Sequence, residues 1–226
     1  MIQPSRLVAA ALGLLALTAA LPAAAQTEKL TLKGKRGPSL LKPGYTIGDY
    51  SGFYSAMAMN RQGLGSKDRM KASFQLEGGS LASAVTADCA GGQSKLVIAW
   101  ITWKREDLTF NCTFGGGAPS DAALTLALGE GSFLQRLQMP QRAGELRWNG
   151  ATIRFETRQV GSMPIGAGKP LGYRFTRDGT EIGALDLNTI MSGPAFYLPP
   201  AGSPDRDAVM AAAMALFTFQ DPAGAR

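Results

Sequence analysis

Residues 208–219 read AVMAAAMALFTF, an uncharged stretch in which Thr218 is the single polar side chain. Ala, Met and Leu are strong helix formers. Ser203-Pro204-Asp205 precedes the stretch as a helix start with the serine as N-cap, and Asp221-Pro222 follows it as a stop. We therefore predict a helix over about residues 204–219. At ~1.5 Å per residue the apolar stretch is about 18 Å long, too short for a bilayer span of ~20 residues.

A helix that is apolar on every face must be surrounded on every face. The rest of the chain reads as short β segments between Gly- and Pro-rich turns; residues 69–76 (RMKASFQL), for example, alternate as a half-buried strand does. Residues 95–103 and 133–139 are further expected strands. We predict a mainly β, single-domain protein: one closed antiparallel β-barrel of about ten to twelve strands around a buried hydrophobic C-terminal helix.

Two hairpins are the clearest local signals in the chain. The stretch ELRWNGATIRF, residues 145–155, has an Asn-Gly turn that places Trp148 opposite Ala151. The stretch YRFTRDGTEIGA has an Asp-Gly turn that places Phe175 opposite Ile182. Each hairpin has one apolar and one polar face, as the wall of a barrel requires.

The first 25 residues have the pattern of a secretory signal peptide. Arg6 precedes an apolar run over residues 7–21, and small residues at Ala23 and Ala25 form a cleavage site. The alternative is a membrane anchor, for which the run is short. We expect cleavage after Ala25 and an exported protein, periplasmic if the source is bacterial and extracellular otherwise.

The chain has two cysteines, Cys89 and Cys112, and no histidine. In an oxidising compartment we expect a disulfide between them, closing a loop of about 24 residues that contributes ~3 kcal/mol on the chain-entropy model. Two free buried thiols are the alternative. Without histidine the commonest general base and metal ligand are missing. We therefore expect no metal, no cofactor and no catalytic residue of a known motif.

Basic residues exceed acidic ones, and the formal net charge is +6. We expect residues 26–44 to form a basic N-terminal arm ahead of a barrel domain over residues 45–222; Leu30 and Leu32 alternate with polar residues in it, a pattern that also allows a short first strand. A second basic group lies on the two hairpins. As candidates for binding an anionic lipid or polysaccharide surface we single out six residues: Lys33, Lys35, Arg36, Arg154, Arg158 and Arg174.

Both basic groups have an alternative interpretation. The arm is also what a solvated tail looks like, and the hairpin arginines stand near Glu145, Glu156 and Glu181, which would neutralise them. Nucleic acid is not an expected partner, given export and the modest charge excess. Four aromatic residues near the start of the domain suit either a ligand site or the barrel core, and we interpret them as core: Tyr45, Tyr50, Phe53 and Tyr54.

The end of the chain resembles that of the tubby-like barrels, which include the LURP-one-related proteins and the phospholipid scramblases. The resemblance lies in the hairpin GYRFTRDGTEIGALDL (172–187), the return strand to Leu198 and the helix sequence RDAVMAAAMALF (206–217), about the last quarter of the chain. It implies a barrel around a buried helix. In that family tubby proteins bind phosphoinositides and scramblases associate with membranes. No position here matches a binding motif of the family, so no functional residue is carried over.

These observations predict an exported, non-catalytic barrel with an envelope-binding or structural role at an anionic lipid surface. One alternative is an enzyme of unrecognised type that uses Lys, Tyr or carboxylate chemistry, with a pair among four acidic residues: Asp49, Glu106, Asp107 and Asp186. Another is a lipocalin-like carrier, in which the helix would lie outside an open barrel with a large apolar cavity.

Overall fold

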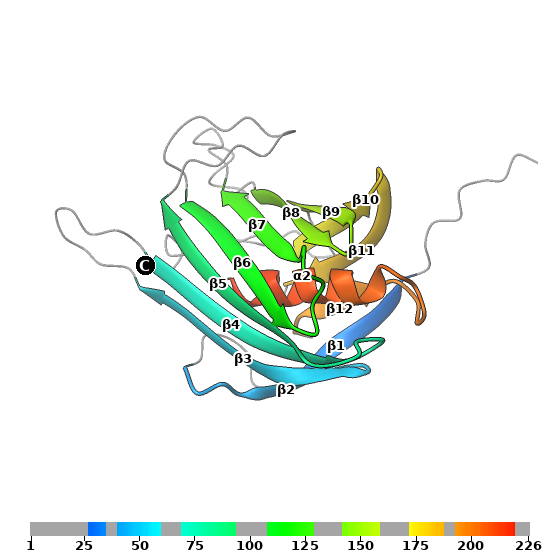
Figure 1. Cartoon of the computed structure of the whole chain (residues 1–226), viewed down its shortest axis with the longest axis horizontal. Helices are drawn as coiled ribbons and strands as arrows, with labels where there is room; N and C mark the ends of the chain where they lie inside the picture. Colours follow the sequence, from blue (N-terminus) through cyan, green and yellow to red (C-terminus); the bar gives the residue numbers. More distant parts are fainter. Residues whose placement is uncertain are drawn as a thin grey trace, which may run out of the picture.

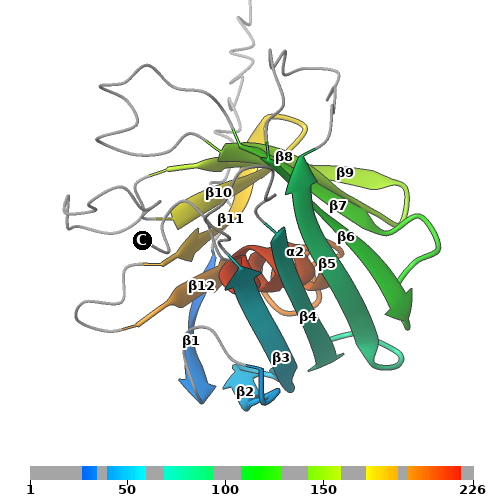
Figure 2. The same cartoon turned by 90° about the vertical axis from the view of Figure 1, so that its left-hand side faces the viewer.

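A computed structural model of the protein describes residues 27–34, 40–59, 69–93, 108–128, 142–158, 172–187 and 193–219. Within these ranges twelve antiparallel strands close into a barrel, and one helix, α2 (Arg206–Thr218), lies inside it (Figures 1 and 2). The strands are β1 (Glu28–Gly34), β2 (Gly44–Ile47), β3 (Tyr50–Met59), β4 (Arg69–Gly78), β5 (Val85–Gln93), β6 (Leu108–Gly116), β7 (Ala123–Leu128), β8 (Arg142–Trp148), β9 (Ala151–Thr157), β10 (Gly172–Arg177), β11 (Thr180–Asp186) and β12 (Ala195–Leu198).

Each strand pairs with the next along the chain, and the first strand pairs with the last, so the sheet has no edge. The closing register places Glu28 opposite Leu198 and Thr31 opposite Ala195. The predicted fold class is confirmed. The strands expected over residues 95–103 and 133–139 lie outside the described residues.

The helix fills the barrel, as its all-round apolar sequence predicts. Ala212 and Met214 are fully buried, and Phe217 packs edge-on against Tyr54, with ring centroids 5.4 Å apart. The strands approach closely because the helix is rich in alanine; a Cβ added at Gly183 would lie 2.9 Å from a methyl carbon of Val209. Among the described residues, no helix combines the length and the hydrophobicity needed to cross a bilayer.

Two predicted details of the C-terminal region are wrong. The N-cap of the helix is Asp205 and not Ser203, because Ser203 belongs to a turn in which its carbonyl accepts the Arg206 amide at 3.2 Å. The Asp205 side chain makes no capping hydrogen bond. A β-bulge in the hairpin of β10 and β11 shifts the register, so that Phe175 lies opposite Gly183 and not Ile182. The bulge places Gly183, which lies against Val209 of the helix, opposite Phe175. The Trp148–Ala151 register of the other hairpin is confirmed.

The N-terminal boundary also differs from the prediction. Residues 28–34, expected in an arm ahead of the domain, form β1, whose Leu32 points into the core and is 3% exposed. Without β1 the sheet would be open between β2 and β12. The barrel therefore begins at Glu28 and not at Tyr45, because a closed sheet needs this strand.

Candidate functional site on the outer wall of the barrel

A buried salt-bridge network ties the start of the helix to the barrel wall. The Arg206 guanidinium donates to Glu28 and to Asp49, each at 2.9 Å, and to the Pro199 carbonyl at 2.6 Å. Its side chain is only 5% exposed, whereas both carboxylates are about half exposed. These partners come from β1, from the turn between β2 and β3, and from the segment that follows β12. The contacts have a structural role, because they hold the helix against the strands that close the barrel.

Asp207, the next residue of the helix, makes a second set of contacts with the barrel wall. The Asp207 carboxylate accepts hydrogen bonds from the Tyr50 hydroxyl at 2.6 Å and from the amide and hydroxyl groups of Ser80. Burial raises the pKa of Tyr50, and its hydrogen bond to the carboxylate raises it further, so the phenol stays protonated. Both oxygens of the Asp207 carboxylate therefore accept hydrogen bonds from residues of the barrel wall. We assign the cluster to stability and not to catalysis.

The carboxylate chemistry of the enzyme alternative finds little support in the described residues. Asp49 is held by Arg206, and Asp186 lies at the far end of β11, at the other end of the barrel. Glu106 and Asp107 lie outside the described residues. In the described part of the chain no group of three His, Cys, Asp or Glu could hold a metal ion.

The disulfide prediction is confirmed. Cys89 on β5 and Cys112 on β6 are direct cross-strand partners and form a disulfide inside the wall. Both are nearly fully buried, at 4% and 2% exposure. The bond fits an oxidising environment, in which such disulfides persist.

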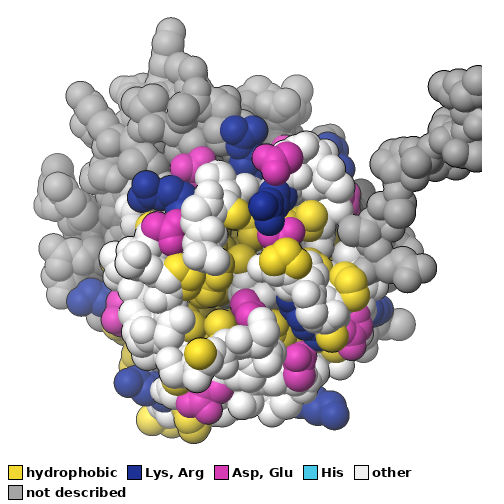
Figure 3. Space-filling model, turned by 45° about the vertical axis from the view of Figure 1, so that its right-hand side comes forward, with side chains coloured by type: hydrophobic (Ala, Val, Ile, Leu, Met, Phe, Trp, Pro, Cys, Tyr) yellow, Lys and Arg dark blue, Asp and Glu magenta, His cyan; other side chains and the backbone are white. Residues whose placement is uncertain are grey.

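The arginines of the second basic group come together on the outer face of β9 and β10, but with glutamates among them. Arg174 contacts Glu156 at 2.9 Å and Glu181 at 3.4 Å, and Arg158 contacts the same Glu156 at 3.2 Å. Arg154 is the cross-strand partner of Glu145. The space-filling view in Figure 3 shows basic and acidic side chains next to one another. This arrangement supports the neutralised, solvated interpretation of these three arginines.

The other basic group has different neighbours. Within the described residues the large exposed hydrophobic side chains are Leu40, Leu41 and Phe53, which are 68%, 85% and 53% exposed. Leu40 and Leu41 directly precede Lys42 in the chain. Phe53 lines a shallow depression of about 580 Å³ together with Lys33 and a second one of about 530 Å³ together with Lys42. We call these five residues the Phe53 corner. Lys35 and Arg36 lie outside the described residues.

The alternation of β3 explains why Phe53 is exposed. Tyr50 and Tyr54 point into the core, as does Tyr45 on β2, so the ring between them in sequence points outward. It lies over Gly44, its cross-strand partner, where an added Cβ would be 3.7 Å from a ring carbon. The core interpretation of the aromatic cluster therefore holds for the three tyrosines and is wrong for Phe53.

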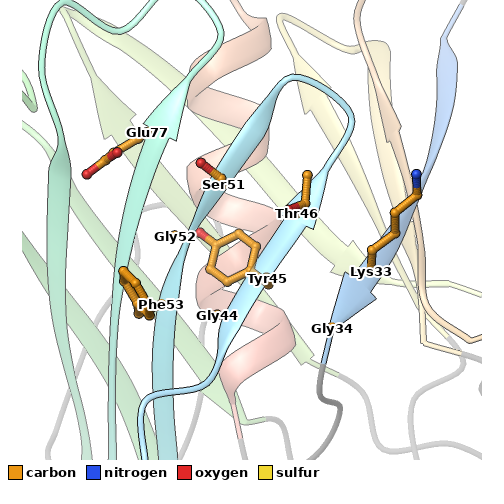
Figure 4. Close-up of a pocket in the computed structure, with 9 residues that line it drawn as sticks. All are labelled: Lys33, Gly34, Gly44, Tyr45, Thr46, Ser51, Gly52, Phe53 and Glu77. Atoms are coloured by element: carbon orange, nitrogen blue, oxygen red, sulfur yellow. The ribbon is translucent and has the colours of Figure 1, made fainter.

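A row of polar side chains crosses the same wall. Lys33 on β1 pairs with Thr46 on β2, Thr46 pairs with Ser51 on β3, and Ser51 pairs with Glu77 on β4. Figure 4 shows the row beside Phe53, with Lys33 and Glu77 at its two ends and the small hydroxyl residues between them. All four residues line the depression of about 580 Å³.

Sequence reasoning found Lys33, assigned Phe53 to the core and missed the rest of this wall. Leu40 and Leu41 were visible as an apolar pair with no strand pattern, in a segment broken by prolines and glycines. The row of Thr46, Ser51 and Glu77 had no such signal, because it depends on the register between four strands. Comparisons with protein-family models, with curated proteins and with solved structures found no match.

Proposed function

We propose that the protein is an exported, non-catalytic barrel that docks on an anionic lipid surface through the Phe53 corner. One observation carries the proposal: the exposed Phe53 ring shares one depression with Lys33 and another with Lys42, and the two exposed leucines directly precede Lys42 in the chain. Exposed apolar patches of this kind mark interaction sites. The two lysines attract anionic partners to this one, and Glu77 and Asp88 line the same two depressions.

The physical balance favours reversible, peripheral binding. The two leucines and the phenylalanine can enter the boundary between headgroups and acyl chains, at ~25 cal/mol for each Å² of apolar surface removed from water. Each lysine near an anionic surface adds about 1 kcal/mol. Together these contributions suffice for transient attachment, whereas permanent anchoring requires a larger hydrophobic insertion.

Other features agree with this role. The disulfide is typical of exported proteins, and the signal-peptide pattern of the N-terminal sequence also indicates export. The end of the chain also resembles the tubby-like barrels, a group in which the scramblases associate with membranes. The helix lies inside the barrel, so the carrier alternative, with a helix outside an open barrel, has no support here.

Vesicle flotation tests the proposal. The protein should bind vesicles that contain phosphatidylglycerol and bind neutral vesicles at least tenfold less well, with the affinity falling between 0.01 and 0.15 M salt as the Debye length shrinks from about 30 to 8 Å. The double substitution Lys33→Glu and Lys42→Glu should weaken binding at least tenfold, as should replacing Leu40, Leu41 and Phe53 together with serine.

The matched control is Arg154→Glu with Arg158→Glu, which changes the net charge equally on the opposite wall. Its effect should stay below twofold. Equal losses from both double variants would show that net charge alone drives binding and would overturn the assignment to the Phe53 corner. Binding to an anionic polysaccharide without any binding to vesicles would overturn the lipid partner.

A further inference from the structure

The row across β1 to β4 carries opposite charges at its two ends. Lys33 and Glu77 are separated by three strand spacings, so their backbones lie roughly 14 Å apart, with the short side chains of Thr46 and Ser51 between them. They are therefore too far apart to pair directly. Among the described residues neither forms an ion pair, and Glu77 accepts one hydrogen bond, from the Gln75 side-chain amide at 2.5 Å.

This charge pattern discriminates between ligands. A simple anion is attracted by the lysine but repelled by the glutamate, and a simple cation experiences the reverse. A group that carries a phosphate and an ammonium satisfies both ends. Exposed side chains change rotamer within nanoseconds, so the lysine and the glutamate can lean over the small residues between them to meet a shorter ligand.

We propose that this row binds the phosphoethanolamine headgroup of a lipid. This inference rests on the proposed function and gives that site its headgroup preference. The phosphate accepts hydrogen bonds from the Lys33 ammonium and from the Thr46 and Ser51 hydroxyls. The ligand's ammonium donates to the Glu77 carboxylate beside the exposed Phe53 ring, whose face attracts cations. A choline headgroup has no N–H to donate, so its hydrogen bond to Glu77 is lost.

Vesicles of constant charge test the headgroup preference. With a fixed fraction of phosphatidylglycerol, the protein should bind roughly three- to fivefold more tightly when the remaining lipid is phosphatidylethanolamine than when it is phosphatidylcholine. Glu77→Gln should abolish this preference. Glu145→Gln, the same change on the outer face of β8, should retain it and controls for the different lipid packing of the two vesicle types. Equal affinity of the unmodified protein for both vesicles, or a preference that survives Glu77→Gln, would overturn the inference.

A soluble headgroup separates this inference from the docking proposal. Titration with glycerophosphoethanolamine should shift the backbone amide NMR signals of Thr46 and Ser51, and glycerophosphocholine should shift them less at equal concentration. If the protein bound no vesicle of any composition, the docking proposal would fall, and this titration would still decide whether the row is a headgroup site. No shift with either compound would overturn the row while leaving binding through the Phe53 corner in place.

Discussion

Two walls of the barrel that look equally basic in sequence differ in what surrounds their charges. β3 and β9 lie six places apart in a ring of twelve strands, so the Phe53 corner and the arginine group face opposite directions. On the β9 side Arg154 lies opposite Glu145 and Arg174 lies opposite Glu156, and Arg174 also contacts Glu181. On the β1 to β4 side the neighbour of Lys33 is a threonine, and the charge is left for a partner. The comparison teaches that strand register, and not the number of basic residues, decides which basic side chains lie next to acidic ones.

The substitution with the largest expected effect tests whether the difference between the two walls requires the folded barrel. Ala212 is fully buried among close-packed walls, so Ala212→Asp should destabilise the domain by several kcal/mol and abolish cooperative unfolding, because an unpaired buried charge is costly. Thermal melting followed by circular dichroism measures this. Ala90→Asp, at an exposed position of β5, is the control and should melt normally. If the unfolded Ala212→Asp variant bound anionic vesicles as tightly as the unmodified protein does, the basic residues of an unfolded chain would be sufficient for binding. The difference between the two walls would then play no part in it.

An intermediate effect should separate the two walls. Arg206→Met removes the cation that holds Glu28 and Asp49, so stability should fall by about 2–3 kcal/mol. Amide hydrogen exchange should become faster in β1 and β2 before it changes in β8 and β9. Arg174→Met, on the solvated wall, should cost less than about 1 kcal/mol, because its side chain is 32% exposed and its ion pairs are screened. Equal losses of stability in the two variants would show that the ion pairs of Arg206 stabilise the protein no more than those of Arg174 do.

The sequence predicted the fold well because its signals are local. The all-apolar helix demanded an enclosing sheet, and the Asn-Gly turn determined the register of β8 and β9. The site was predicted only in part. The outward direction of Phe53 depends on the alternation of β3, and the row that ends at Glu77 depends on three strand registers. The bulge opposite Phe175 was likewise hidden, because it lies where Gly183 meets Val209 of the helix, a contact that no local sequence pattern reveals.

The smallest effect concerns a single turn on the arginine side. Asp121 caps the turn between β8 and β9 by accepting the Gly150 and Asn149 amides at 2.7 and 2.9 Å, and these bonds hold its pKa below the ordinary value of 3.8. A lowered folded-state pKa stabilises the protein above the unfolded value, and this contribution is lost as the pH falls through the folded one. Unfolding in denaturant at pH 7 and at pH 2 should therefore show a slightly smaller loss of stability for Asp121→Asn than for the unmodified protein. An identical pH dependence would show that this cap does not contribute.

The pairing of β1 with β12 determines when the protein can fold. Among the described elements the first strand is synthesised first, whereas its partner, Ala195–Leu198, and the helix that fills the core are synthesised last. Until then the growing sheet has two open strand edges and no helix to fill its interior, and the closing contact joins residues as far apart as Glu28 and Leu198, which makes it slow to form. We therefore expect the barrel to close only after β12 and the helix have been made, and a chain that stops before β12 to form an aggregation-prone open sheet and not a smaller barrel.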